Sequence, residues 1–157
     1  DGGGRTALRL AMRGELEDVC EAIASRADFE GINDVDPEHG TLLHWAAAKG
    51  HEFICTAILE RPDFEAVNQR DGISCTALHY AVGRGLLQVC MSIVRRRDFK
   101  ALEARDAAGK TALAVATKLR TDYYQDGCDS ALGREYERIC DFLEETRLQR
   151  SQSAPRA

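Results

Sequence analysis

The chain has 157 residues, of which 44% are hydrophobic and 30% charged, a composition that suits one soluble domain with a packed core. Its formal net charge of -5 gives no overall basic surface, and its longest apolar stretch, residues 42–48, is too short to cross a bilayer. We therefore expect neither a nucleic-acid nor a membrane partner. The sequence opens without a signal-peptide pattern or an initiating Met, so we expect it to begin inside a longer protein.

The sequence repeats itself every 35 residues. Each unit has an acid, a threonine five residues later, a leucine two residues after the threonine and an alanine five residues after it. The four threonines are Thr6, Thr41, Thr76 and Thr111. A constant period of this size indicates a stack of small units, none of which can bury its apolar face alone. We expect a solenoid, which offers a long surface rather than an enclosed pocket.

Each unit predicts two helices. After the threonine, small and apolar residues recur at spacings of three and four, and Gly50 and Gly85 are expected to end this first helix in a left-handed conformation. A second helix follows, with apolar pairs that should face the core. These pairs are Val19 and Ile23, Ile54 and Ile58, and Val89 and Ile93. Polar segments such as 33–39 and 68–74 then predict projecting hairpin fingers.

The last unit is interrupted. It regains the register only at Cys140, fifteen residues late, because of an insertion around Thr121 to Gly133. The insertion is polar, and we expect either a solvated loop or a helical extension. A second helix over 133–148 should close the stack with its polar face, and residues 149–157 are expected to form a disordered tail.

Two segments carry a recognisable motif. Residues 41–46 read Thr-Leu-Leu-His-Trp-Ala, and residues 76–81 read Thr-Ala-Leu-His-Tyr-Ala. They resemble the T-P-L-H-x-A signature of ankyrin repeats, although no threonine is followed by proline and the period exceeds the usual 33 residues. The resemblance implies an all-α ankyrin-repeat solenoid of helix-turn-helix units with hairpin fingers. The units are expected at about 1–35, 36–70, 71–105 and 106–148.

Four of the six cysteines occupy one position in successive units. They are Cys20, Cys55, Cys90 and Cys140. Equivalent positions on stacked helices lie about 8 to 10 Å apart, whereas a disulfide needs Cα atoms within about 7 Å. We expect small buried hydrophobes in a reducing compartment, the cytoplasm or nucleus. A redox-sensing or metal-binding protein stays open as a third hypothesis, and it needs an exposed thiol of low pKa.

The residues that suggest chemistry also have structural interpretations. His44 and His79 fall at the histidine of the motif, where the resemblance implies helix capping and hydrogen bonds between repeats rather than metal binding with Cys75. Acids between Asp122 and Asp129 lack the spacing of a calcium loop. Arg95 to Arg97 would complement the dipole of a helix end, with a localisation signal as the alternative. We expect no cofactor, no metal and no enzymatic activity.

One set of aromatic and basic residues is not explained by the repeat pattern alone. Trp45 and Tyr80 follow their threonines by four residues, at a position that in ankyrin repeats commonly faces the concave groove. Aromatic side chains bury much area at interfaces, although packing against neighbouring helices is an alternative. Basic residues lie nearby in the sequence. The predicted partner-binding site consists of Trp45, Lys49, Arg70, Tyr80, Arg84, Arg105 and Lys110.

The resemblance implies a protein-binding module. It would bind a partner protein or peptide, with acidic residues around an apolar anchor, through its concave face and finger tips, as a monomer. The alternative is a regulatory or substrate-docking segment of a larger enzyme or channel whose active domain lies outside the chain. The identity of the partner does not follow from the fold.

Overall fold

The computed structural model describes residues 11, 14, 16–26, 29–125 and 131–153. In this part of the chain three complete helix pairs follow one another. They are α3 (Leu42–Lys49) with α4 (Glu52–Glu60), α5 (Ala77–Gly83) with α6 (Leu87–Arg95), and α7 (Ala112–Gln125) with α8 (Ala131–Ser153). A further helix, α2 (Glu17–Ala24), stacks on α4 as the second helix of the first repeat.

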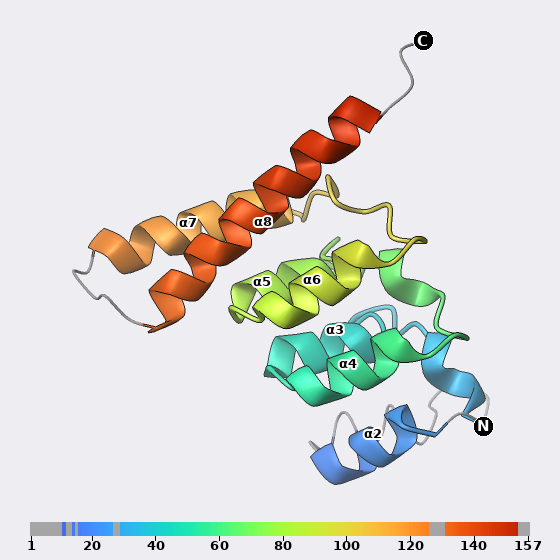
Figure 1. Ribbon diagram of the computed structural model, residues 1–157. Helices are drawn as coiled ribbons and strands as arrows, with labels where there is room; N and C mark the ends of the chain where they lie inside the picture. Colours follow the sequence, from blue (N-terminus) through green and yellow to red (C-terminus); the bar gives the residue numbers. More distant parts are fainter. Residues whose placement is uncertain (1–10, 12–13, 15, 27–28, 126–130, 154–157) are drawn as a thin grey trace.

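The helices form two layers (Figure 1). The first helices α3, α5 and α7 pack side by side in one layer, and the second helices α2, α4, α6 and α8 pack in the other. Two short 3-10 turns, η1 (Glu30–Asn33) and η2 (Ala66–Asn68), lie in the connections between repeats. This arrangement confirms the predicted all-α solenoid. No helix in the described part of the chain is both long and apolar enough to span a membrane.

Threonine and histidine together start the first helices of repeats 2 and 3. The backbone N–H of Thr41 donates to Nδ1 of His44 at 3.1 Å, and the threonine hydroxyl lies 2.8 Å from the same nitrogen. Thr76 and His79 repeat this arrangement at 3.2 and 2.8 Å. All four residues are buried. The histidines therefore satisfy N-terminal groups that a helix leaves without partners, in agreement with the structural role expected for them.

Glycines with positive φ follow the first helices, as the sequence predicts. Gly50 has φ 84° and ends α3, while Gly85 has φ 70° and lies just beyond α5. A Cβ atom at Gly85 would lie 2.6 Å from Cδ1 of Leu132, so glycine there also allows the close approach of α8.

The core lies between the two layers. The predicted apolar pairs of the second helices in repeats 2 and 3 are buried: Ile54, Ile58, Val89 and Ile93. Val19, in α2, is 42% exposed, unlike its buried counterparts Ile54 and Val89. The side chain of Ile23 lies outside the described residues.

An aspartate closes each finger. Oδ1 of Asp71 accepts backbone hydrogen bonds from Ile73 and Cys75 at 3.0 and 2.9 Å. Asp36 in repeat 2 and Asp106 in repeat 4 likewise each accept two backbone hydrogen bonds within their fingers. Neighbouring fingers also bond to each other, since the N–H of Ala107 donates to the Ile73 carbonyl at 3.0 Å. The fingers thus stack in step with the helices.

Arginines tie each repeat to the one before it. Arg96 donates to the carbonyls of Leu59 and Phe64 at 2.8 and 2.5 Å, and its guanidinium lies 5.5 Å from the centre of the Phe64 ring. Arg61 donates in the same way to the carbonyls of Arg26 and Phe29. The last carbonyls of a helix have no partner within it, and here the next repeat supplies one. Together with Arg150, we call Arg61 and Arg96 the arginine ladder.

The insertion in the last repeat lengthens both of its helices. α7 has 14 residues and α8 has 23, whereas α3 has 8 and α4 has 9. Helical extension is therefore the better of the two expectations, although residues 126–130 lie outside the described part. The predicted disordered tail over 149–157 needs correction for residues 149–153, because α8 continues to Ser153, and residues 154–157 lie outside the described part. Arg150 holds this end of the helix by donating to the carbonyls of Val94 and Phe99 at 3.0 and 3.2 Å.

Candidate partner-binding site

The seven residues of the predicted site fall into two groups. The helix group lies on α3 and α5 or directly after them, and the finger group lies on the fingers of repeats 3 and 4. The helix group contains Trp45, Lys49, Tyr80 and Arg84, and the finger group contains Arg70, Arg105 and Lys110. The five basic residues are exposed, and the two aromatic residues are half-buried.

Trp45 belongs partly to the core and partly to the surface. Its indole packs against buried side chains, and its ring centre lies 5.2 Å from that of His51, at the start of α4. The remainder of the side chain is open to solvent. Packing therefore accounts for part of this side chain, and contact with a partner stays a prediction for the exposed part.

Tyr80 has a hydroxyl that is already used within the protein. It donates to Oδ2 of Asp71 at 2.5 Å, and the tyrosine ring stands edge-on to His44 at 6.1 Å between ring centres. Burial and the hydrogen bond to the Asp71 carboxylate raise the pKa of Tyr80. Tyr80 therefore connects α5 to the finger of its own repeat, and only its ring is left for a partner.

Lys49 and Arg84 bring two positive charges to the ends of neighbouring first helices. Nε of Arg84 donates to the carbonyl of Ala48 at 2.6 Å, at the end of α3 and next to Lys49. A cation at this place also complements the negative end of the helix dipole. The contact fixes where the Arg84 charge lies on the surface.

The finger group is held by backbone contacts. Arg70 donates to the carbonyl of Arg105 at 2.6 Å, and Arg105 donates to the carbonyl of Gly109 at 2.8 Å. The carbonyl of Lys110 lies 3.2 Å from Nε2 of His79. These contacts align the three positive residues on two stacked fingers.

The first helices carry few acids. α3 and α5 contain no acid, and the one acid of α7, Asp122, pairs with Lys118 at 2.6 Å. In the second layer, α2 and α4 contain acids and no Lys or Arg, α6 contains Arg95 and no acid, and α8 contains both signs. We call the exposed side of α3, α5 and α7, with the fingers of repeats 3 and 4, the first-helix face. It is basic in a chain whose net charge is -5.

The buried thiols and imidazoles lack the properties of reactive groups. The four aligned cysteines are 0% exposed and free of disulfides. Burial raises the pKa of Cys55 to about 12 and also raises that of Cys90, which keeps the thiols protonated. Burial lowers the pKa of His44 and His79, which keeps both imidazoles neutral near pH 7. These shifts argue against redox sensing by the aligned cysteines, while Cys128 lies outside the described residues.

Two features of the site region were missed from the sequence. The bond between Tyr80 and Asp71 has no sequence signal, because it depends on how the finger folds back. The arginine ladder does have one: Arg61 and Arg96 are 35 residues apart, and each precedes an aspartate by two residues. The structure assigns Arg96, the middle residue of the triple-arginine segment, to repeat packing.

Comparison with known protein families gives one match, to a family described as ankyrin repeats (3 copies), over residues 43–128. The matched region is more than half of the chain and includes all seven residues of the predicted site. No curated protein matches the chain.

Proposed function

Because the chain belongs to the ankyrin-repeat family, whose repeats are generally protein-protein interaction modules, we propose that it is a non-enzymatic adaptor for an acidic protein segment. The segment crosses the first-helix face and reaches the fingers of repeats 3 and 4. The exposed part of Trp45 receives an apolar side chain, and Lys49 and Arg84 pair with the acids beside it. The module works as a monomer, in the cytoplasm or nucleus, where the buried thiols stay reduced.

The positive charge of the first-helix face supports this proposal. Positive residues gather on the first-helix face of a chain that is acidic as a whole. A local field of this kind attracts an acidic partner over long distances and repels a basic one. Arg84, Arg70 and Arg105 are already held by backbone carbonyls, so less side-chain freedom is lost when the partner binds.

The sole tryptophan of the chain gives a direct test, because Trp45 lies within the proposed site. The probe is a peptide with one leucine between two pairs of glutamates. It should change the Trp45 fluorescence with an affinity that falls as salt is added. A peptide with glutamine in place of glutamate is the matched control. Equal binding of the two peptides, or no binding of the glutamate peptide, would contradict the proposal.

A further inference from the structure

Phe53, in α4, is the most exposed of the large apolar side chains in the described part of the chain, at 66%. The fold does not require an aromatic residue there. At the same position of the other second helices stand Asp18, Gln88 and Arg138, which are all polar and exposed. An apolar side chain that the scaffold does not need, and that water does not favour, points to a contact with another molecule.

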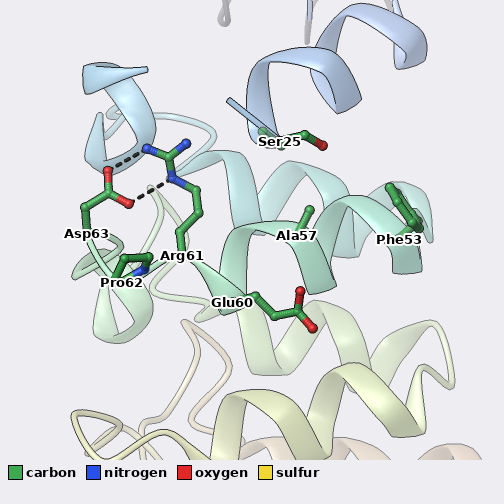
Figure 2. Close-up of a pocket in the computed structure, with 8 residues that line it drawn as sticks. Ser25, Phe53, Ala57, Glu60, Arg61, Pro62 and Asp63 are labelled. Carbon is green, nitrogen blue, oxygen red and sulfur yellow. Dashed lines mark hydrogen bonds and ion pairs between the residues drawn. The ribbon is translucent and has the colours of Figure 1, made fainter. Parts of the chain in front are cut away.

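Phe53 stands at one end of a groove between α2 and α4 (Figure 2). The groove has a volume of about 500 Å³, and Ala57 and Pro62 contribute to its apolar lining. Figure 2 shows the Arg61–Asp63 pair at the end opposite Phe53, with Ala57 between them. The groove therefore offers an apolar strip long enough for a short peptide segment, with an aromatic ring at one end.

The one arginine in the groove is occupied by the fold. Arg61 is 7% exposed, lies 2.5 Å from an oxygen of Asp63 and donates to the carbonyl of Phe29 at 3.0 Å. As a member of the arginine ladder it has no room to pair with a ligand. Its charge is balanced by Asp63, so neither residue of this pair sets the sign of the groove.

Most of the other charges around the groove are negative, and the exception is Arg26, the exposed residue after Ser25. Glu60 lines it, Glu52 is next to Phe53 in α4, and Glu21 lies one helical turn before Ser25 on α2. All three glutamates are exposed, and within the described residues none of them forms an ion pair with Lys or Arg. The groove is an apolar strip with acids along its edges.

The groove between α6 and α8 shows that this pattern is particular to repeats 1 and 2. Arg95 and Glu145 both line that groove, so it carries both signs of charge. Phe142 stands there at the position of Ala57 and takes up part of the space. The groove between α2 and α4 thus carries more acids than bases, whereas the lining of the groove between α6 and α8 has no such excess of acids.

We propose that the groove between α2 and α4 is a second docking site, which binds a basic peptide segment carrying one apolar side chain. The apolar side chain packs against Phe53 and Ala57, and flanking lysines or arginines pair with Glu21, Glu52 and Glu60. This site lies in the layer opposite the first-helix face and selects the opposite charge. The two surfaces therefore hold two different partners at once.

The probe for this site is a peptide with one leucine between two pairs of lysines. In amide NMR spectra of the isotope-labelled chain it should shift Ser25, Phe53, Ala57 and Glu60. Phe53→Ser and Glu60→Lys should each weaken binding by about tenfold. Phe53 is exposed, so the serine variant should keep its fold, and its urea midpoint verifies this. Gln88→Ser, at the same position of repeat 3, is the matched control and should leave the affinity unchanged.

Three results would overturn the proposal. Shifts centred on Trp45 and Lys49, or no shifts, would mean that the groove does not take the basic peptide. An unchanged affinity of Phe53→Ser would mean that the ring is not the anchor. Shifts of the Phe53 amide that follow protein concentration without peptide would assign the groove to a second copy of the chain.

Discussion

The hydroxyl of Tyr80 donates a 2.5 Å hydrogen bond to Asp71, the same carboxylate that closes the finger of repeat 3. One aspartate thus joins a helix, a finger and an aromatic residue of the proposed binding face. Asp71 is only 9% exposed, so water cannot easily replace a lost partner. The position of the finger beside α5 depends on this contact.

Tyr80→Phe should lower the free energy of unfolding by about 1–2 kcal/mol, because the buried carboxylate loses its hydroxyl donor. Urea denaturation measures the change. Tyr124→Phe is the control, since that hydroxyl bonds to Glu137 at an exposed site, and it should cost less than about 0.5 kcal/mol. Equal costs of the two substitutions would show that the Asp71 contact does not stabilise the repeat.

Arg96→Lys should lower the free energy of unfolding by about 2 kcal/mol. Lysine keeps the charge but cannot donate to Leu59, Phe64 and Asp98 together from one planar group. Arg95→Lys, one residue earlier and exposed, should change stability by less than about 0.5 kcal/mol. If the two substitutions changed the free energy of unfolding by similar amounts, the arginine ladder would not stabilise the fold.

The fold follows from the sequence because each repeat carries the same local signals. Thr41, His44 and Gly50 mark where α3 starts and ends, and the period transfers these signals to the next repeat. The helical form of the insertion could not be chosen from the sequence, since its polar residues suit an exposed helix as well as a loop. The contacts of Arg150 could not be predicted from the sequence, because this residue lies outside the 35-residue register and reaches repeat 3 only through the long helix α8.

The candidate site was less accessible to sequence reasoning. The positions of Trp45 and Arg84 on the first-helix face follow from helical spacing. Whether a side chain also serves the fold depends on contacts between distant segments, such as that between Arg84 and Ala48. Phe53 did break the repeat pattern, but its groove depends on how α2 and α4 pack.

Stability should fall as the pH drops below about 6.5. Burial lowers the pKa of His44 and His79 in the folded chain, so the unfolded chain binds protons first and acid favours unfolding. Their contribution is complete above the pKa of an unfolded histidine, near 6.5, and is lost as the pH falls through the folded values. Urea midpoints measured at several pH values between 7.5 and 5 follow this loss of stability.

Cys55 should resist thiol reagents in the folded protein, whereas half-buried Cys75 should react faster. Cys55→Ala should cost roughly 1 kcal/mol, and Cys55→Asp should unfold the repeat by burying a charge. Because the folded pKa of Cys55 is about 12, stability should also fall as the pH rises past the ordinary thiol value. Rapid labelling of Cys55 at neutral pH would contradict its burial.

Trp45→Ala should weaken binding of the glutamate peptide by about 2 kcal/mol if the indole is the anchor. Arg84→Glu should mainly slow association and flatten its salt dependence. Because the first variant lacks tryptophan, a fluorescent label on the peptide replaces the intrinsic signal, and circular dichroism checks the fold. A Trp45→Ala protein with a lowered melting temperature but normal affinity when folded would assign Trp45 to the core rather than to the binding site.

The arginine ladder runs in one direction along the chain. Arg61, Arg96 and Arg150 each donate to backbone carbonyls of an earlier repeat, and for Arg96 and Arg150 these include a carbonyl in the last turn of α4 or α6. Ribosomes make the earlier repeat first, so its last carbonyls stay open until the arginine of the following unit has emerged. The carbonyls at the end of repeat 3 stay open for the longest stretch of synthesis, because α7 and most of α8 are made before Arg150. The contacts that complete the end of repeat 3 can therefore form only after nearly all of α8 has been made.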